Sequence, residues 1–327
     1  MRAALVKEFG PPSSIVVEDV PDLTPGPGEV VIDVAAVSIN FPDILVVEGT
    51  YQNLPSRPFS PGKEAAGKVV AVGPGVQRVI VGQRVLVLVE YGGYAEQLLA
   101  PEDLVMQIPD SMSYEEAAAF GLVYSTAYFG LFRRGQLAMG ETVLVTGVGG
   151  GVGSAAVQLA KTKGCRVIAL AQDDAKAQFA RELGADIVLT STPESLRDDL
   201  LAATDGNGVD VVLEMLGGDY FTQIIRATAW EGRIVIVGFA SGGQNPIKPG
   251  HILVKSISLI GLVSSDYRDR APALMRSTMA EMFELFDQGK LNAAVDTTFP
   301  LDKVGDALQY VKDGRVKGKV VVTTGRG

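Results

Sequence analysis

The sequence has very few of the residues that build metal sites and nucleophilic catalytic devices. Its 327 residues include one cysteine, Cys165, and one histidine, His251. A single cysteine excludes a disulfide within the chain and a zinc site made of several thiolates, because each needs two or more sulfurs. A Ser-His-Asp or Cys-His device would have to be built around His251. This cysteine usage predicts a protein of a reducing compartment.

Basic charge is also scarce, since 29 Lys and Arg stand against 38 Asp and Glu and give a formal net charge of −9. Nucleic acids and anionic membrane surfaces attract a basic face, so this balance disfavours both partners. No run approaches the roughly 20 apolar residues that a membrane span requires, and the apolar run at residues 1–7 is too short for a signal sequence. We therefore expect a cytoplasmic protein with no nucleic-acid partner and no membrane partner.

Two kinds of pattern divide the chain. Up to about residue 120, β-branched runs such as 30–37, 67–73 and 84–89 alternate with Pro and Gly turns, which predicts a barrel or sandwich. From Thr142 to about residue 263, short apolar strands alternate with helical stretches, among them a helix over 219–229. Such alternation predicts a parallel, doubly wound Rossmann sheet, so the fold class is α/β with a second, mainly β domain.

The end of the chain is expected to return to the β domain. A helix is predicted over 270–289, and a strand is predicted over 318–322. The expected division is therefore one domain of residues 1–122 and 293–327, and a dinucleotide-binding domain of residues 123–292.

A glycine loop follows the predicted strand 143–145 and precedes a predicted helix. Its key residues are Gly147, Gly150 and Gly153. Glycines let the backbone turn tightly and approach a pyrophosphate, whose charge then lies on free N–H groups at the helix N-terminus. A tight turn without a ligand is the alternative. The strand before the loop, the helix after it and a second strand at 167–170 favour a dinucleotide site.

The end of that second strand bears on which coenzyme binds. NAD-preferring domains place a carboxylate there for the ribose 2′-hydroxyl, but this chain has Ala171 at that position. Lys176 is close enough in sequence to contact a 2′-phosphate, which favours NADPH over NADH. Asp173 and Asp174 oppose this interpretation unless they point outward, and Lys176 could also be an ordinary exposed helix lysine.

A family resemblance extends over almost the whole chain. The motifs that carry it are, in order, Ser38-Ile39-Asn40-Phe41-Pro42-Asp43, Pro61-Gly62-Lys63-Glu64-Ala65-Ala66-Gly67, Gly92-Gly93-Tyr94-Ala95-Glu96, Gly121 to Tyr128, and the glycine loop with Gln158-Leu159-Ala160-Lys161. With them the chain resembles the zinc-independent quinone oxidoreductases of the medium-chain dehydrogenase/reductase superfamily, the zeta-crystallin-like group. The resemblance implies that the β domain is a GroES-like, partly open barrel.

The resemblance also implies a set of site residues. The implied coenzyme residues are Asn40, Thr126, Gly147, Gly150, Gly151, Val152, Gly153, Lys176, Gly238, Phe239, Leu262 and Arg315, with Val263 beside Leu262 and Lys317 as the alternative to Arg315. Tyr51 matches a tyrosine of the quinone pocket, and Tyr51 and Asn40 are the implied catalytic residues. Leu45 and Thr190 stand where the group has two further tyrosines.

The resemblance to zinc-dependent members fails at the metal ligands. Those members carry His-Glu where this chain has Lys63-Glu64, and they carry cysteines that are missing here. An ammonium group cannot replace a neutral imidazole on zinc, so we expect no metal and a structural role for Glu64, paired with Lys63 or with a backbone amide. Without a Lewis acid, a quinone or an α,β-unsaturated carbonyl is the better acceptor, because it accepts hydride readily.

We therefore expect an NADPH-dependent enzyme that passes hydride to a quinone or enone in the cleft between its domains. One alternative is an enoyl-thioester reductase on the same scaffold, and another is an NADPH-binding structural protein with little turnover. The resemblance also implies a homodimer, for which residues 257–263 are the candidate edge strand.

Overall fold

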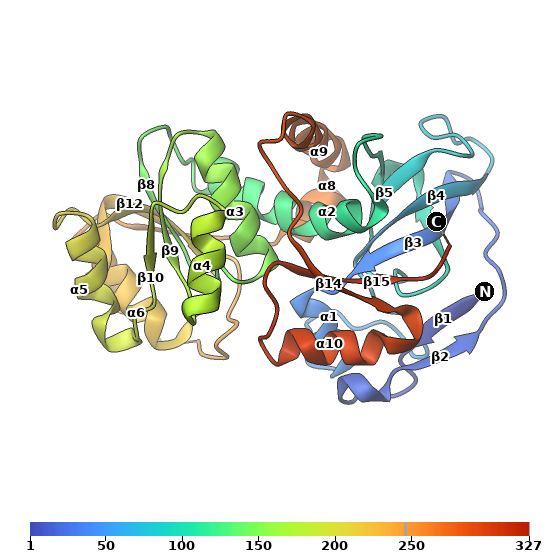
Figure 1. Cartoon of the computed structure of the whole chain (residues 1–327), viewed down its shortest axis with the longest axis horizontal. Coiled ribbons are helices and arrows are strands. Elements are labelled where there is room, and N and C mark those ends of the chain that lie inside the picture. Colours follow the sequence, from blue (N-terminus) through green and yellow to red (C-terminus); the bar gives the residue numbers. More distant parts are fainter. Residues whose placement is uncertain (245–246, 327) are drawn as a thin grey trace. The chain divides into compact units, whose positions relative to one another are not determined.

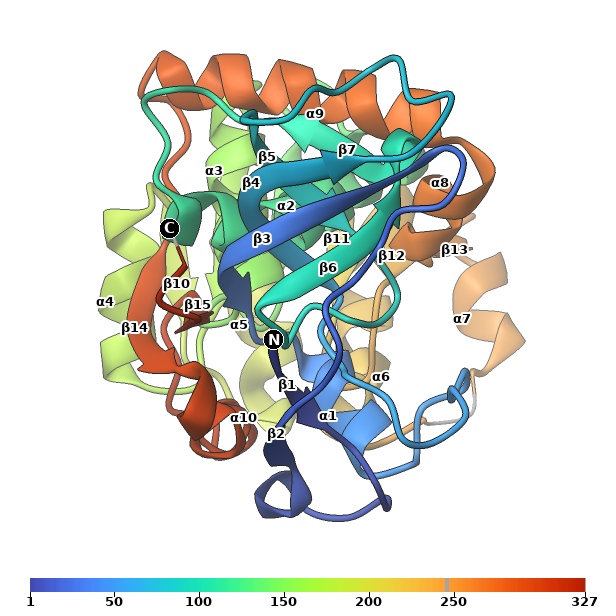
Figure 2. The same ribbon diagram turned by 90° about the vertical axis from the view of Figure 1, so that its right-hand side faces the viewer.

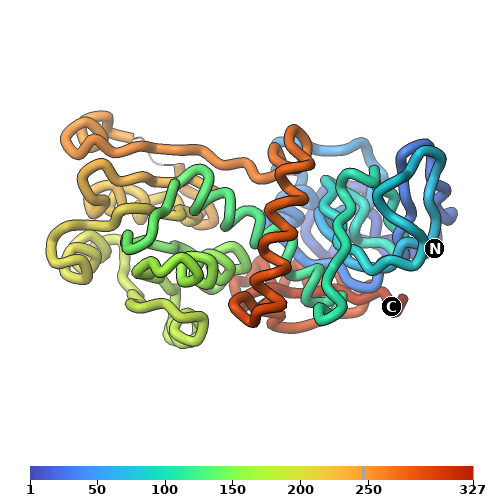
Figure 3. The backbone as a smooth tube through the Cα atoms, turned by 90° about the horizontal axis from the view of Figure 1, so that it is seen from above, coloured from blue at the N-terminus to red at the C-terminus, as the bar shows by residue number. Residues whose placement is uncertain are grey.

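The computed structural model describes residues 1–244 and 247–326, which form two compact units. Unit 1 comprises residues 1–122 and the chain from Ser265 onward, and unit 2 comprises Val123–Ser264. Figure 3 follows this path by colour, from blue and cyan in unit 1 through green and orange in unit 2 and back to red in unit 1. The chain thus returns to unit 1 at residue 265 rather than at the expected residue 293.

Unit 2 is built on a six-stranded sheet whose strands are all parallel. The strands are β8 (Thr142–Val145), β9 (Arg166–Leu170), β10 (Ile187–Leu189), β11 (Val209–Glu214), β12 (Thr228–Ile236) and β13 (Ser258–Gly261). Their spatial order is β10-β9-β8-β11-β12-β13, which is the doubly wound order 3-2-1-4-5-6. The predicted Rossmann sheet is confirmed. Because the order reverses between β8 and β11, a ligand is expected at the carboxyl ends of these strands.

Helices cover the sheet of unit 2, with α3 and α4 to one side of the strands in Figure 1 and α5 and α6 to the other. Their bounds are α3 (Gly151–Thr162), α4 (Asp174–Glu182), α5 (Pro193–Ala203), α6 (Gly218–Ala227) and α7 (Pro249–Leu253). Apolar side chains of α5 and α6 share one core with Leu144, Ile168 and Val212 of successive strands.

The predicted helix over 219–229 is wrong at its end, because α6 stops at Ala227 and Thr228 already belongs to β12. Thr228 closes the helix by donating from its hydroxyl to the Ile224 oxygen at 2.8 Å. Trp230 therefore lies on a strand and is 70% exposed.

Unit 1 is mainly β, as expected. Its strands are β1 (Arg2–Leu5), β2 (Val16–Asp19), β3 (Glu29–Ser38), β4 (Glu64–Val72), β5 (Arg84–Leu88), β6 (Gln97–Pro101), β7 (Val105–Gln107), β14 (Val295–Pro300) and β15 (Lys319–Thr323). Strand β3 is central: β4 pairs with one edge, and β6 and β15 follow one another along the other (Figure 2). Register shifts interrupt the β3–β4 pairing. Gly67 is required at one of them, since a Cβ there would lie 2.0 Å from the Asp33 oxygen.

The helices of unit 1 explain where the chain returns to it. They are α1 (Phe41–Val47), α8 (Ser264–Arg270), α9 (Pro272–Asp287) and α10 (Val304–Lys312), while α2 (Tyr114–Tyr128) crosses into unit 2 and continues as the π-helical segment η3 (Phe129–Arg134). The helix predicted over 270–289 begins at Pro272, in the first helical turn where proline is favoured. It packs on unit 1 through Phe283 and Phe286, which lie 5.8 and 5.9 Å from the Phe120 ring.

Within the described ranges, no helix combines the length and the apolar character needed to cross a membrane.

Candidate active site

The glycine loop after β8 brings two backbone segments unusually close together. A Cβ on Gly153 would lie 2.5 Å from the Gly147 oxygen and 2.7 Å from Val148 Cα, so a larger residue cannot start α3 so near the strand. Gly147 has a φ of +61°, in the left-handed region. The Gly150 N–H donates to the Gly147 oxygen at 3.0 Å and closes the turn. This is the tight backbone turn that the glycines predicted, and it brings α3 close to β8.

The N-terminus of α3 fits a pyrophosphate. Gly150 occupies the N-cap position, and no side chain caps the helix there. A Cβ on Gly150 would have its nearest neighbour at 3.5 Å, so the approach to the helix end is open. The first-turn N–H groups of Gly151, Val152 and Gly153, together with the positive end of the helix dipole, are suited to bind an anion.

Lys176 lies against the same loop. It belongs to the first turn of α4, and a Cβ on Gly149 would lie 2.5 Å from Lys176 Cδ, so the lysine stem packs on the Gly149 backbone. Its Nζ donates to Gln172 Oε1 at 2.7 Å and lies 3.8 Å from Asp173 Oδ2. The side chain is only 11% exposed, so Lys176 is not the ordinary surface lysine of the alternative interpretation.

Three further predicted residues lie on loops at the carboxyl ends of neighbouring strands. The Ala240 N–H donates to the Met215 oxygen, which ties the segment with Gly238 and Phe239 to the loop after β11. That loop also neighbours Gly147, whose Cβ would lie 3.8 Å from Met215 Cβ. Leu262 is buried after β13.

Thr126, also in unit 2, forms a hydrogen bond between its hydroxyl and that of Ser264. Its Oγ1 donates to Ser264 Oγ at 2.8 Å, and the residue is 4% exposed. The predicted coenzyme residues of unit 2 thus lie at the carboxyl ends of its strands and on the adjoining helix α2.

Sequence reasoning missed Glu214, the last residue of β11. Its carboxylate is fully buried and accepts backbone hydrogen bonds from Leu216 at 2.9 Å and from Gly217 at 3.1 Å. Burial raises the pKa of this carboxyl, although the two backbone N–H groups oppose the shift. Glu214 therefore orders the loop that lies beside Gly147. The signal was an acidic residue directly after the apolar run Val211-Val212-Leu213.

In unit 1, Asn40 belongs to a buried polar cluster. Its Nδ2 donates to Glu64 Oε1 at 3.1 Å, and its Oδ1 accepts from Lys319 Nζ at 2.6 Å. Glu64 also accepts from Ser38 Oγ at 2.5 Å and from the Leu122 N–H at 2.6 Å. Lys63 and a backbone amide were the two partners expected for Glu64, and in the structure the backbone amide of Leu122 binds it.

Lys319 was missed, although a single charge at the start of the apolar strand 318–322 could have indicated it. Its Nζ lies 3.4 Å from Glu64 Oε1 and also donates to the Ile39 oxygen at 2.9 Å. Burial lowers the pKa of this ammonium, while the carboxylates of Glu64 and Asp43 oppose the shift. Lys319 is thus a basic residue of the tail that contacts Asn40.

Arg315 lies elsewhere on unit 1. It is exposed, pairs with Asp313 at 3.0 Å and stacks on the Tyr310 ring at 4.6 Å. The alternative residue, Lys317, is also exposed, and its backbone N–H donates to Asp296.

Asp43 supports the backbone at Asn40. Its Oδ2 accepts from the Asn40 N–H at 2.9 Å and from the Tyr94 hydroxyl at 2.7 Å. Its Oδ1 is buried and has no hydrogen-bond partner. Burial raises the pKa of Asp43 to about 6, against the lowering effects of the Lys63 charge and of the Tyr94 hydrogen bond.

Tyr51 lies beside an ammonium group. Lys63 Nζ is 4.6 Å from the centre of the Tyr51 ring and 5.3 Å from that of Tyr91. The same Nζ pairs with Glu90 at 2.5 Å, and Arg268 binds the other oxygen of Glu90 at 3.0 Å. Burial, followed by the Glu90 and Asp43 charges, raises the pKa of Tyr51, so its phenol stays protonated at neutral pH.

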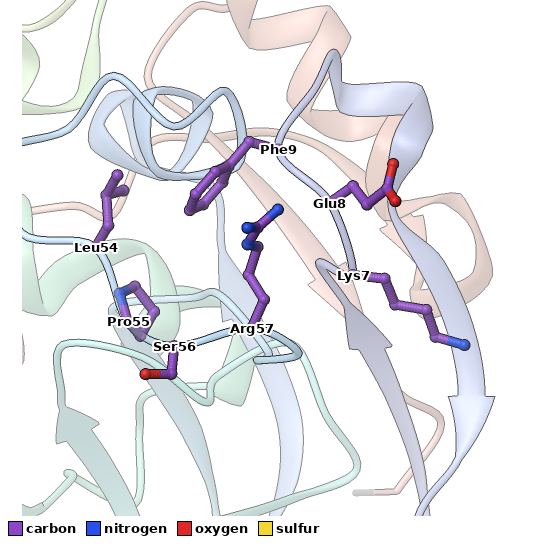
Figure 4. Close-up of a pocket in the computed structure, with 7 residues that line it drawn as sticks. All are labelled: Lys7, Glu8, Phe9, Leu54, Pro55, Ser56 and Arg57. Carbon is purple, nitrogen blue, oxygen red and sulfur yellow. The ribbon is translucent and has the colours of Figure 1, made fainter.

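A separate hollow on unit 1 involves none of the predicted residues. Arg57 and Phe9 lie next to each other there (Figure 4), and Arg57 Cζ is 4.5 Å from the centre of the Phe9 ring. The lining residues are Lys7, Glu8, Phe9, Leu54, Pro55, Ser56 and Arg57.

Comparison with known proteins identifies the family. Residues 26–110 match the alcohol dehydrogenase GroES-like domain, and residues 151–288 match the zinc-binding dehydrogenase family. The quinone oxidoreductase-like protein 2 homolog of Nematostella vectensis is 39% identical over 99% of this chain and 89% of its own length. The chain belongs to the quinone oxidoreductase-like proteins of the medium-chain dehydrogenase/reductase superfamily. The resemblance inferred from the motifs is confirmed.

Solved structures of this superfamily agree with the fold. A mycobacterial protein in complex with NADPH has a TM-score of 0.93 and 31% identity, covering 99% of this chain and 100% of that one. The CurK enoyl reductase has a TM-score of 0.89 and 31% identity, covering 98% and 99%. In this quinone oxidoreductase-like chain, no three His, Cys, Asp or Glu side chains of the described residues are grouped so that they could bind a metal ion.

Proposed function

We propose that this protein is an NADPH-dependent, zinc-independent reductase that transfers hydride to a quinone or to another α,β-unsaturated carbonyl compound. The observation that carries the proposal is the position of Lys176 against Gly149. It places a cation beside a loop suited to pyrophosphate, at a strand end where Ala171 replaces the carboxylate of NAD-preferring domains. The mycobacterial relative that contains NADPH supports the same coenzyme.

When bound, the nicotinamide would supply the hydride. The proposed task of the chain is to bind and orient the coenzyme and the acceptor. The amides of Gly150, Gly151, Val152 and Gly153 would bind the pyrophosphate, and Lys176 would bind the 2′-phosphate.

Other predicted residues would contact the nicotinamide and the acceptor. Asn40 and Thr126 are the candidates for the nicotinamide side, and Gly238, Phe239 and Leu262 are further candidates for coenzyme contacts. Tyr51 would donate a hydrogen bond to the acceptor oxygen, for which its raised pKa keeps the phenol protonated. We no longer favour Arg315 for coenzyme binding, since its guanidinium pairs with Asp313 on the surface.

The proposal of zinc independence rests on Lys63. This residue stands where zinc-dependent members carry a histidine ligand, and its ammonium is already paired with Glu90 at 2.5 Å. The positive charge of Lys63, at the position of a zinc ligand, repels Zn²⁺ rather than binding it. Without a Lewis acid, an acceptor that delocalises the incoming charge is favoured.

A second candidate is reduction of an enoyl thioester on the same scaffold. The similarity to the CurK enoyl reductase supports this candidate. A polyketide synthase subunit of Mycobacterium tuberculosis supports it as well, since it is 34% identical over 98% of this chain, although the match covers only 15% of that subunit. An enoyl thioester is also a conjugated carbonyl, so the same coenzyme site would serve both reactions.

One experiment separates these functions. Purified protein is mixed with NADPH and with a panel of quinones, simple enones and enoyl thioesters, and the nicotinamide absorbance is followed with and without a chelator. Turnover of quinones or enones that the chelator does not change supports the proposal. Turnover of enoyl thioesters alone supports the second candidate, and loss of turnover on chelation contradicts zinc independence. Tight NADPH binding without any turnover would indicate a binding protein.

We also propose a homodimer formed through β13, which is the edge strand of the unit 2 sheet. An unpaired edge is a template for pairing with a second copy. Trp230, Leu253 and Val254, on β12 and on the segment before β13, are at least 70% exposed and would be covered in such a dimer. Light scattering of the wild type and of Val254→Glu tests this, because the variant should be monomeric.

A further inference from the structure

Gln172, the second residue after β9, ties the ammonium of Lys176 to the end of that strand. Its Oε1 accepts the hydrogen bond of 2.7 Å from Lys176 Nζ. The backbone N–H of Lys176 is bonded in turn to Asp173 Oδ1 at 2.9 Å. Both ends of the lysine are therefore attached to the short segment between β9 and α4.

Packing against the glycine loop restricts the lysine stem as well. A Cβ on Gly149 would lie 2.5 Å from Cδ, 2.8 Å from Cγ and 3.0 Å from Cε of Lys176. Three consecutive carbons of the stem thus run along the Gly149 backbone. With these carbons confined, the hydrogen bond from Nζ to Gln172 Oε1 fixes the ammonium next to the Gln172 side chain.

The group that accepts this hydrogen bond carries no charge. The carboxylate of Asp173 lies farther away, at 3.8 Å from Nζ, and caps α4 through its other oxygen. A glutamate at position 172 would bring a full negative charge to hydrogen-bond distance from the ammonium and would repel a phosphate there. The glutamine holds the ammonium through a neutral amide oxygen and so adds no further negative charge beside it.

Gln172 also has donors to offer. Its Oε1 is engaged by Lys176, while its Nε2 has no hydrogen-bond partner among the residues that the structure describes. The side chain is exposed, so the two N–H groups of Nε2 are accessible next to the Lys176 ammonium. An ammonium and an amide N–H side by side are suited to the oxygens of one phosphate group.

We propose that Gln172 makes the coenzyme site selective for a ribose 2′-phosphate, by holding Lys176 Nζ through Oε1 and by donating to the phosphate from Nε2. The inference rests on the coenzyme part of the proposed function and is independent of the acceptor. One oxygen of Asp173 caps α4, and the other lies farther from Nζ than Gln172 Oε1 does.

The test measures binding without any acceptor. Calorimetry compares 2′,5′-ADP, which carries the phosphate in question, with 5′-AMP, which lacks it. The variants are Gln172→Glu, Gln172→Leu and, as a matched control, Gln178→Glu, which makes the same change at an exposed glutamine of the adjoining helix α4. A neutral phosphate donor is worth roughly tenfold in affinity and an added charge somewhat more.

We expect the wild type to bind 2′,5′-ADP at least about tenfold more tightly than 5′-AMP. Gln172→Glu should remove this preference, and Gln172→Leu should reduce it by about threefold or more, while affinity for 5′-AMP stays within about twofold. The control should keep the preference of the wild type.

Three results would overturn the inference. In the first, both ligands weaken equally in the Gln172 variants, which indicates general damage to the site. In the second, Gln172→Leu keeps the full preference, so the amide has no role. In the third, the wild type itself shows no preference for 2′,5′-ADP, which also removes NADPH from the proposed function. Failure of the acceptor panel with the preference intact would contradict only the reductase activity.

Discussion

Lys319 Nζ donates a hydrogen bond of 2.6 Å to Asn40 Oδ1, which joins the last strand of unit 1 to the start of α1. The same Nζ lies 3.4 Å from the fully buried carboxylate of Glu64. The amide of Asn40 is thus held between a cation on its oxygen and an anion on its nitrogen. This arrangement determines which way the amide faces.

We expect Lys319→Met to destabilise the protein by about 3 kcal/mol, because it leaves the Glu64 charge buried without its cation. Urea unfolding measures the loss. Lys317→Met is the control, since Lys317 is exposed and should change stability by less than about 0.5 kcal/mol. Adding Glu64→Gln to Lys319→Met should recover part of the loss, because the uncompensated charge is then removed. An equal loss of unfolding free energy in Lys319→Met and Lys317→Met would contradict this account.

The raised pKa of Asp43 predicts how stability depends on pH. The folded-state pKa is about 6 against an ordinary value of 3.8, so the folded protein binds this proton more tightly than the unfolded chain does. The contribution of Asp43 is therefore fully present below about pH 4 and is lost as pH rises through about 6. A shift of this size corresponds to roughly 3 kcal/mol.

The comparison variant is Asp43→Asn, which keeps the shape of the side chain and cannot ionise. Urea unfolding of both proteins between about pH 4 and pH 7 cancels the titration of all other groups. The wild type should lose stability relative to Asp43→Asn across this range by a few kcal/mol. A constant difference between the two proteins would show that Asp43 titrates outside the range.

Gly150 offers a substitution that should abolish coenzyme binding and spare the fold. It is the N-cap of α3, with φ −93° and ψ 171°, and a Cβ there has its nearest neighbour at 3.5 Å. Aspartate is a good N-cap residue, so Gly150→Asp should leave thermal stability unchanged or raise it slightly. Its carboxylate would occupy the helix end and repel a pyrophosphate, which should weaken NADPH binding by at least about tenfold.

Two neutral variants at this position separate the causes. Gly150→Ala adds a Cβ without a cap and should bind NADPH nearly as the wild type does. Gly150→Asn adds the cap without the charge, so its loss of NADPH affinity should lie between the losses of Gly150→Ala and Gly150→Asp. Calorimetry provides all three affinities. Unchanged affinity in Gly150→Asp would refute the placement of the pyrophosphate.

The parts of this fold that depend on local pattern could be predicted from the sequence. Strands β8 to β13 carry their signal in short apolar runs, and the glycines of the loop after β8 predicted the tight turn at Gly147. The return to unit 1 could not be predicted in this way, because it depends on α9 packing against Phe120, a contact distant in sequence. The end of α6 was missed because pairing with β11 draws Thr228 into β12.

The same distinction holds for the site. Asn40 and Lys176 belong to short motifs and could be named from the sequence. Lys319 is 279 residues from Asn40, and its contact with Asn40 comes from the β15–β3 pairing, which no local pattern contains. The pairing of Lys63 with Glu90 rather than with Glu64 likewise joins residues 27 positions apart, which no local pattern contains.

Tyr51→Phe tests whether the phenol of Tyr51 acts on the acceptor. The ring lies 4.6 Å from Lys63 Nζ, and phenylalanine keeps that contact, so stability should change by less than about 0.5 kcal/mol. Loss of one hydrogen bond to the acceptor oxygen should lower kcat/KM for the acceptor by about tenfold, while the Kd for NADPH stays unchanged. Lys63→Met is the complementary variant, because it keeps the phenol and removes the cation under the ring. If Tyr51→Phe lowers NADPH affinity as much as turnover, the phenol acts on the coenzyme and the proposed role of Tyr51 is wrong.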